Sequence, residues 1–423
     1  MNKKIDCHFP YYDILLNVPN DSVTWCCKLV ENGKLEDLDP NALHDAPLLK
    51  SIRNSLAQGI QHSACRNCWD AEKNNIQSWR QAEGALPREL ADKDLNQPPY
   101  NNQFRRIEIF FDTTCDLACV YCDPSFSSNW AQENKQTNIH PEFLNKVYVD
   151  DQAKIQKIKD TIRSVSKTVS KDERVDIVIL GGEPFLSPRV KNGKFIEYIT
   201  LFYENAPIES KLQITFITNC NTPDQVFDKN LAILRKAKTM YPNLNVHITM
   251  SLECVGKLTE ITRFGSVWSQ VDKNINKWLQ EDWILFNFNT TFNAMTIHAV
   301  DDYVKYLVNL YEKHKRQIII SPNICYSPEG LQVSIMPASY ANYIDDAIQT
   351  VNDNKHCFGQ DEDHGYERLL ITLINIKNSL GKSIDKINDL KTLMEYSNKY
   401  RQVDFKKHIP SLYKYVYNIT EDP

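Results

Sequence analysis

Residues 104–122 read FRRIEIFFDTTCDLACVYC, a strand-like run followed at once by three closely spaced cysteines. The Ile and Phe residues at 104–111 predict a β-strand. Cys115, Cys119 and Cys122 come directly after it, so we expect their sulfurs in one loop at the carboxyl end of that strand. By analogy with (β/α) barrels, chemistry gathers at this end of the strands, which makes the loop the first candidate site.

Five further strand-like runs follow, at 174–180, 211–218, 244–251, 284–291 and 317–324. Helix-length stretches separate them. In 297–313, for example, apolar residues recur at three- and four-residue steps behind Thr296, the expected N-cap. Strands that alternate with helices imply parallel pairing through right-handed crossovers. The predicted fold class is therefore α/β, with a partial (β/α)6 TIM-type barrel.

Two regions of different character flank this core. Residues 1–100 are rich in cysteines and turns and end in Asn96-Gln97-Pro98-Pro99-Tyr100, which is typical of a linker. From 336 onward two apolar stripes predict helices: Tyr340, Ile344, Ala347 and Val351, then Leu369, Leu373, Ile376 and Leu380 before the helix stop Gly381. We expect a small domain at 1–100, the barrel at 101–335 and a helical extension at 336–423 that covers one end of the barrel.

Composition narrows the classes of function. The formal net charge of -5 gives no basic excess for nucleic acid, so we expect no DNA partner. The start of the sequence is polar and the longest apolar runs are only strand-sized, which predicts a cytoplasmic protein with no membrane partner. In a reducing compartment, 12 cysteines at close spacing indicate metal or redox chemistry rather than disulfides.

The three cysteines of the loop suit an iron–sulfur cluster, because thiolates are the usual ligands of such clusters. A four-iron cluster held by three cysteines keeps one iron open to another ligand. A zinc site, which usually recruits four protein ligands, or a group of buried thiols are the alternatives. A second motif, Gly181-Gly182-Glu183-Pro184, ends the second strand; its glycines let backbone approach a ligand, and its carboxylate suits an ammonium group.

The CxxxCxxC loop with Tyr121 before its last cysteine, followed by Gly-Gly-Glu-Pro after the next strand, resembles the radical S-adenosylmethionine (SAM) superfamily. The resemblance implies that Cys115, Cys119 and Cys122 hold a 4Fe–4S cluster whose open iron chelates the methionine part of S-adenosyl-L-methionine. It also implies that Tyr121 contributes to the adenine environment.

Further residues follow from the same resemblance. Gly181, Gly182 and Glu183 would receive the amino group of the methionine. Ser251 and Arg263 are similar to residues that meet the carboxylate or ribose, and the arginine fork matches a carboxylate; a structural ion pair is the alternative for Arg263. Thr218, Asn219 and Asn289 fit polar positions that face the cofactor, with less specificity.

A second set of cysteines lies at the front: Cys7, the pair Cys26-Cys27, and Cys65 with Cys68. Four thiolates are the complement of a closed metal site. The run resembles a twitch domain, the shortened relative of the SPASM domain, which binds one auxiliary 4Fe–4S cluster; placed first in the chain, it is similar to enzymes often found in phage-type genomes.

One position departs from the twitch pattern. Asp21 stands where that pattern expects glycine, and the register favours Cys26 over Cys27 as the ligand. A zinc knuckle that staples a small domain is the alternative at this site.

The resemblance implies an enzyme that reductively cleaves SAM to a 5′-deoxyadenosyl radical, which abstracts hydrogen from a substrate. We expect a peptide or protein side chain as the substrate and an electron donor such as flavodoxin or ferredoxin. The alternatives are an enzyme of the same chemistry that modifies a nucleotide, sugar or amine, and a non-catalytic iron–sulfur or zinc protein. The sequence does not decide the substrate, the fate of SAM, the reductant or the oligomeric state.

Overall fold

The computed structural model describes residues 7–73, 78–82, 104–143, 151–171, 173–359 and 365–418. It divides into two compact units that interleave along the chain. The first comprises Met1–Thr113, Lys146–Phe216 and Asp228–Val246, and the second Thr114–Asn145, Ile217–Phe227 and His247–Pro423. The expected linker at 96–100 lies outside the described residues, and the domain limits drawn from the sequence stay a prediction.

The first unit contains a mainly parallel sheet in the order β7-β6-β4-β1-β2-β3. Its strands are β1 (Asp13–Asn17), β2 (Ser22–Thr24), β3 (Gly33–Lys34), β4 (Arg106–Phe110), β6 (Arg174–Leu180) and β7 (Lys211–Thr218). β1, β4, β6 and β7 run parallel, and β1–β2 and β2–β3 are antiparallel. The segment before residue 100 therefore contributes β1 directly to the sheet beside β4.

A row of isoleucines across this sheet explains its register. Ile14 pairs with Ile107, Ile107 with Ile177, and Ile177 with Ile214. All of them are fully buried. β-Branched side chains pack well on a pleated surface, and a slip by one residue would turn the whole row to the other face of the sheet.

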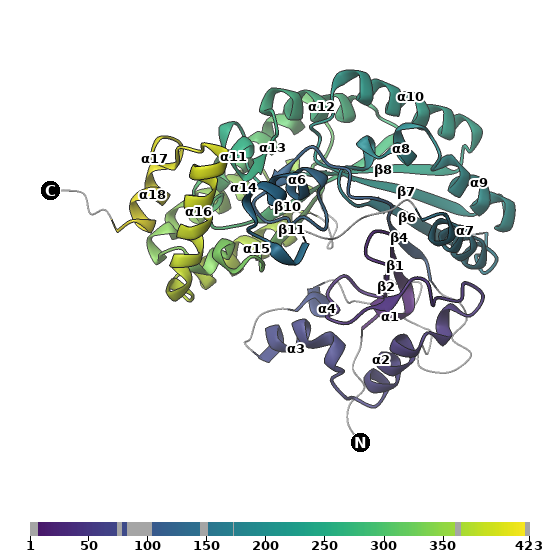
Figure 1. Ribbon diagram of the computed structural model, residues 1–423. Coiled ribbons are helices and arrows are strands. Elements are labelled where there is room, and N and C mark those ends of the chain that lie inside the picture. Colours follow the sequence, from purple (N-terminus) through teal and green to yellow (C-terminus); the bar gives the residue numbers. More distant parts are fainter. Residues whose placement is uncertain are drawn as a thin grey trace. The chain divides into compact units, whose positions relative to one another are not determined.

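Helices of the first unit supply the rest of its core. They are α1 (Phe9–Tyr12), α2 (Pro47–Ala57), α3 (Arg66–Lys73), α4 (Trp79–Ala82), α7 (Gln152–Ser166), α8 (Pro188–Lys191), α9 (Ile196–Asn205) and most of α10 (Asp224–Met240), with the 3-10 turns η1 (Leu43–Asp45), η2 (Ser63–Cys65) and η4 (Pro184–Leu186). Asp151 is the N-cap of α7, and its carboxylate accepts the backbone N–H groups of Ala153 and Lys154. α7 packs against α9 (Figure 1), and both bury an apolar stripe.

The second unit contains the parallel pair β10 (Ile284–Phe292) and β11 (Ile320–Ile324), the end of β8 (Leu244–Ser251), and the short antiparallel pair β5 (Ala118–Cys119) and β9 (Arg263–Phe264). Its helices are α6 (Ser128–Thr137), α11 (Lys257–Thr262), α12 (Trp268–Gln280), α13 (Val300–His314), α14 (Ala341–Asp353), α15 (Tyr366–Ser379), α16 (Ile387–Arg401), α17 (Phe405–His408) and α18 (Pro410–Val416). The 3-10 turns are η3 (Pro141–Phe143), η5 (Ile297–Ala299), η6 (Glu329–Leu331), η7 (Val333–Ile335), η8 (Ala338–Tyr340), η9 (Lys355–Cys357) and η10 (Ile384–Lys386). Figure 1 shows α16, α17 and α18 grouped together toward the C-terminus.

The structure confirms a mixed α/β fold with a large, mainly parallel sheet and many helices, and each of the six expected strands is present. The closure into a (β/α)6 barrel stays a prediction. One local expectation was wrong: α13 begins after Ala299, and Thr296 instead precedes the turn η5, where its hydroxyl bonds to the carbonyl of Asn293. Within the described residues, no helix combines the length and the apolar character that crossing a membrane requires.

Candidate functional site

The cysteine loop is fastened to β9. β5 contains Cys119, which pairs with Arg263 across the antiparallel ladder, and Ala118 pairs with Phe264. The backbone N–H of Val120 donates to the carbonyl of Thr262 at 2.8 Å. The register thus places Arg263 directly opposite a predicted ligand.

The first turn of α6 holds the other side of the loop. Ser128 Oγ accepts the N–H of Cys115 and donates to its carbonyl, both at 3.0 Å. The amide of Asn129 donates to the carbonyl of Asp116 at 3.0 Å, and the indole N–H of Trp130 donates to the carbonyl of Cys119 at 2.8 Å. Because side chains of α6 satisfy the loop carbonyls, the loop has a defined shape without a disulfide; all three cysteines are free thiols.

Burial governs the thiols of this loop. It raises the pKa of Cys119 to about 11, against the opposing positive charges of Arg263 and Arg401. It also raises the pKa of Cys122, with a further contribution from the negative charge of Cys119. At neutral pH these thiols hold their protons until a metal displaces them. The backbone N–H of Leu117 points at the sulfur of Cys115, with N and Sγ 3.5 Å apart.

Glu253 is a residue that the sequence analysis did not single out. It is fully buried, and Arg263 binds it through Nη2 at 2.7 Å and Nε at 3.0 Å. The hydroxyl of Tyr121 donates to Glu253 Oε1 at 3.0 Å, and the Arg263 guanidinium lies 5.6 Å from the centre of the Tyr121 ring. Arg263 therefore forms the structural ion pair that was the alternative to a cofactor contact. Tyr121 is held beside this pair by its hydrogen bond to Glu253. The signal in the sequence that could have identified Glu253 is its position two residues after Ser251, a predicted cofactor-binding residue.

The other polar positions of the second unit have local partners. Thr218 Oγ1 accepts the N–H of Cys220 at 3.1 Å. The Asn219 amide donates to Asp116 in the cysteine loop at 2.8 Å. Asn289 accepts from the Asn323 amide at 2.9 Å, while Ser251 ends β8 half-buried. Asn219 thus contacts the cysteine loop.

The Gly-Gly-Glu-Pro motif lies in the first unit, at the end of β6. Gly181 has a φ of +107°, and a Cβ there would stand 2.7 Å from the carbonyl oxygen of Asp112; only glycine allows this approach. Gly182 donates its N–H to the same carbonyl at 3.3 Å. These residues line a small hollow together with Phe111 and Ser187.

Carboxylates border this hollow. Glu183 is 1% exposed and accepts the N–H of Phe185 at 3.1 Å, which caps η4. Asp112, another residue that the sequence analysis missed, accepts the hydroxyl of Ser187 at 2.6 Å. The motif therefore combines close backbone approach with two carboxylates.

The structure gathers the front cysteines from three segments of the first unit. Cys7 and Cys65 pack against a small core that contains Cys68 and Trp69. Burial, and to a lesser extent the charge of Cys68, raises the pKa values of Cys7 and Cys65 to about 12. Cys65 ends η2 and Cys68 lies in the first turn of α3, so the CxxC spacing turns both toward one place.

Cys26 and Cys27 differ in their neighbours. The pKa of Cys26 is raised by a hydrogen bond with Cys27 and by burial, and Cys7 is among the groups that interact with it. The same hydrogen bond lowers the pKa of Cys27, whose other charged neighbours are Glu108, Lys28 and Arg106. The N–H of Lys28 lies 3.4 Å from Cys26 Sγ. The charge of Cys7 thus acts on the Cys26 thiol.

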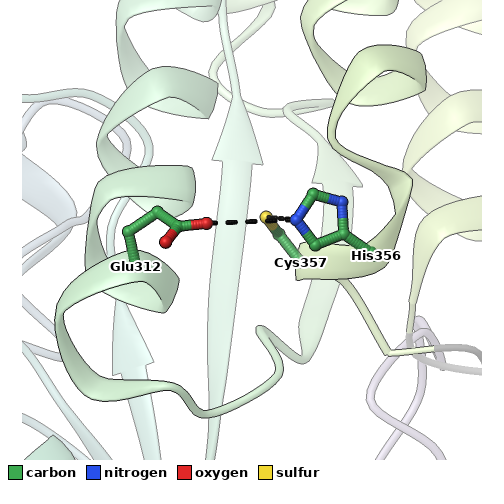
Figure 2. Close-up of side chains that lie close together, drawn as sticks. All are labelled: Glu312, His356 and Cys357. Atoms are coloured by element: carbon green, nitrogen blue, oxygen red, sulfur yellow. Dashed lines mark hydrogen bonds and ion pairs between the residues drawn. The ribbon is translucent and has the colours of Figure 1, made fainter.

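Another group of possible ligands lies in the second unit (Figure 2). Glu312 of α13 and His356 and Cys357 of η9 bring their ligand atoms within 4.8 Å of one another. The side chains of Glu312 and His356 are 51% and 62% exposed, and Glu312 pairs with Lys315. A surface ion pair beside a buried thiol accounts for this arrangement.

Neither the models of known protein families nor the curated protein sequences give a match to this chain. Among solved structures, the chain is similar to one described as "Native anSMEcpe with bound AdoMet", with a TM-score of 0.41 and 13% identity over 59% of this chain and 60% of that one. It is also similar to "Native anSMEcpe with bound AdoMet and Cp18Cys peptide", with a TM-score of 0.40 and 14% identity over 59% and 60% of the two chains. The match thus spans about three fifths of those chains, and likeness of this degree carries no argument here.

Proposed function

We propose that this chain is a radical SAM enzyme with two iron–sulfur clusters. Cys115, Cys119 and Cys122 would hold a 4Fe–4S cluster with one open iron. When bound, the cluster and S-adenosyl-L-methionine supply reductive cleavage of the sulfonium to a 5′-deoxyadenosyl radical, which abstracts hydrogen from the substrate. Three half-buried thiols on one loop, fastened by α6 and β9, are the observation that carries this proposal.

The donor set fits a cluster better than a single zinc ion. Zinc with bonds of about 2.3 Å in tetrahedral geometry draws its thiolates to within roughly 3.8 Å of one another. A cube of four irons, each with its own thiolate, holds the sulfurs farther apart. The cysteine loop offers three thiolates, the number that leaves one iron of such a cube open, whereas structural zinc sites usually have four protein ligands.

The chain's own residues would then bind and orient the cofactor. Gly181 and Gly182 expose backbone that approaches a ligand closely, and Glu183 offers a carboxylate for the amino group. Tyr121 would give a flat surface for the adenine, and its hydrogen bond to Glu253 fixes the ring. Arg263 neutralises Glu253, a negative charge that raises the pKa of Cys119.

The contributions of the remaining polar residues are part of the same proposal. Ser251 is the candidate for the carboxylate or ribose of SAM, since Arg263 is engaged by Glu253. Asn219 would act through Asp116 on the shape of the cysteine loop. Thr218 and Asn289 keep their proposed places facing the cofactor.

The front set would hold the auxiliary 4Fe–4S cluster through Cys7, Cys26, Cys65 and Cys68. Supporting this are the burial of Cys7 and Cys65 beside Cys68 and the interaction of Cys26 with Cys7. Four cysteine ligands close a cluster, so its tasks would be electron relay and stabilisation of the small region around it. We therefore include in the proposal that the front region acts as a twitch domain, which binds one auxiliary 4Fe–4S cluster.

We extend the proposal to a peptide or protein side chain as substrate and to flavodoxin or ferredoxin as electron donor. This extension follows from the resemblance of the front cysteines to a twitch domain.

The decisive test is SAM cleavage. Anaerobically reconstituted protein with dithionite and SAM should form 5′-deoxyadenosine, measured by liquid chromatography and mass spectrometry. Cys119→Ala should abolish this product, while Cys357→Ala, a matched change of a buried cysteine outside both proposed sites, should not. Undiminished 5′-deoxyadenosine from Cys119→Ala would overturn the assignment.

The substrate class needs a separate experiment. Candidate peptides deuterated at one side-chain position should transfer deuterium to 5′-deoxyadenosine if they are substrates. Transfer from a deuterated nucleotide, sugar or amine, with none from any peptide, would instead establish the small-molecule alternative.

A further inference from the structure

Arg401 is a buried arginine whose place no part of the proposed chemistry explains. It is the last residue of α16, and Gln402 follows with a φ of +55°, which ends the helix. The Arg401 side chain is only 2% exposed. Arginine is almost never buried to this extent without partners that compensate its charge.

Its partners come from three separate segments of the second unit. The guanidinium carbon lies 4.5 Å from the centre of the Trp130 ring, 5.0 Å from that of Phe264 and 5.5 Å from that of Tyr396. Cation–π attraction favours this enclosure. Nε donates to Glu133 Oε1 at 2.9 Å, an oxygen that also accepts the Tyr396 hydroxyl.

One end of the guanidinium is left without a partner. Nη2 of Arg401 is buried and makes no hydrogen bond within the described part of the chain. A buried N–H donor of a charged group with no acceptor is costly, and native proteins rarely leave one. This atom therefore points to an acceptor that the described residues do not supply.

The surroundings of Arg401 contain two of the three loop cysteines. Trp130, which stacks under the guanidinium, donates its indole N–H to the carbonyl of Cys119. Cys122 and Phe264 pack against the same apolar cluster of Ala118, Trp130 and Tyr396. The positive charge of Arg401 also opposes the upward shift of the Cys119 pKa. The unpaired donor thus belongs to the neighbourhood of the loop sulfurs.

We propose that Arg401 is a positioning residue of the loop cluster, whose buried charge and unpaired Nη2 serve the sulfur atoms there and raise the cluster's reduction potential. The proposal rests on the proposed function, since it presumes a cluster on Cys115, Cys119 and Cys122. Positive charge and hydrogen bonds to sulfur stabilise the more negative, reduced state. One electron then passes more readily from an external donor, such as reduced flavodoxin or dithionite, to the cluster.

In this proposal the C-terminal helix α16 contributes to the cluster site as well as to the packing of the second unit. α16 would carry the charge that the cysteine loop itself lacks, and Glu133 would hold the guanidinium in orientation through Nε. Arg263 also acts on Cys119, but Glu253 engages two of its nitrogens, Nη2 at 2.7 Å and Nε at 3.0 Å, whereas Glu133 engages Nε of Arg401 and leaves Nη2 without an acceptor among the described residues.

The test is a reductive titration followed by electron paramagnetic resonance (EPR), with the loop cluster identified as the one whose signal changes on adding SAM. Arg401→Gln should lower its midpoint potential by about 59 mV or more, a tenfold change in the one-electron reduction equilibrium. Arg401→Lys keeps the charge and should lie closer to the wild-type value. Glu133→Gln removes a negative charge beside the same arginine and should shift the potential upward.

Midpoint potentials that shift in opposite directions in Arg401→Gln and Glu133→Gln would show that charge, not packing, is responsible. A looser loop would shift the potentials of both variants in the same direction. An unchanged potential in Arg401→Gln, at wild-type iron and sulfide content, would overturn the proposal. If Arg401→Gln fails to fold or to hold the cluster, Glu133→Gln decides: an upward shift supports the proposal and any other result contradicts it. A wild-type protein that holds no SAM-responsive cluster would instead refute the proposed function.

Discussion

The two cysteine sites differ in how the chain builds them. The loop at Cys115–Cys122 lies on one short segment, and side chains of α6 and the β9 ladder hold its backbone. The front set draws its thiols from segments around residues 7, 26 and 65–68, joined by a small apolar core. The loop is thus shaped by hydrogen bonds to its backbone, whereas the arrangement of the front set depends on apolar packing between distant segments.

Their electrostatics differ in the same sense. Two buried arginines, Arg263 and Arg401, act on Cys119 in the loop. Near the front set the corresponding cation is Arg80, which is 20% exposed and pairs with Glu72. Buried positive charge favours the reduced state of a cluster, so we expect this effect to be larger at the loop than at the front set.

The largest predicted effect separates the two sites by function. Cys115→Ala should reduce SAM cleavage by more than the roughly 10–100-fold that loss of an outer partner costs a metal site. Cys68→Ala should lose about four of about eight irons per chain, yet keep 5′-deoxyadenosine formation. Iron and sulfide quantification beside the product assay checks both. Loss of SAM cleavage in a folded Cys68→Ala protein would contradict the claim that only the loop site is required for this reaction.

A second prediction concerns the ligand within the front pair. Cys26→Ala should lower the iron content by about four per chain, while the adjacent Cys27→Ala should retain all of about eight. The reason is that Cys26 interacts with Cys7, whereas Cys27 lies among Glu108, Lys28 and Arg106. The reverse result would mean that Cys27, and not Cys26, is the ligand of the front cluster. Four irons together with one zinc in the wild-type chain would establish the zinc knuckle instead.

The third prediction compares the ion pairs beside the two sites. Arg263→Met leaves Glu253 buried and uncompensated, and should lower the free energy of unfolding by about 3–5 kcal/mol. Arg80→Met breaks a more exposed pair and should cost less, about 1.5–3 kcal/mol for a hydrogen bond to a charged group. Urea unfolding of the metal-free protein measures both. Equal costs would show that the loop pair is no more buried in solution than the front pair.

The smallest effect is a pH dependence of cluster assembly. The pKa values of Cys7 and Cys65 are about 12 and that of Cys119 is about 11, so these thiols are protonated at pH 7 and must release protons when they bind iron. Assembly should therefore proceed further at pH 8.5 than at pH 7, more steeply at the four-thiol front site. Iron content of Cys68→Ala and Cys115→Ala after assembly at each pH distinguishes the sites. No dependence on pH at either site would contradict raised thiol pKa values.

Much of the fold could be predicted because the strands are local patterns. The runs at 174–180, 211–218 and 244–251 became β6, β7 and β8 with the same bounds, since each is an apolar, β-branched stretch between turns. β1 was missed because its pairing partner, β4, lies far along the chain, and its five residues stand in a region dominated by cysteines. β5 and β9 have two residues each and no pattern of their own.

The candidate site shows the same limit. Cysteine spacing and the Gly-Gly-Glu-Pro motif are visible in the sequence because close neighbours create them. The partnership of Tyr121 with Glu253 spans 132 residues, and that of Glu133 with Arg401 spans 268. No periodicity or spacing links such residues, so only the fold could reveal that a C-terminal arginine stands near the cysteine loop.

The central claim is that Cys115, Cys119 and Cys122 hold a cluster with an iron open to SAM. Its most direct test is the EPR spectrum of the dithionite-reduced protein before and after SAM is added. The account predicts that SAM changes the signal of one cluster in the wild type and in Cys68→Ala, and that Cys119→Ala shows no such change. An unaltered wild-type spectrum, or a SAM response that persists in Cys119→Ala, would contradict it.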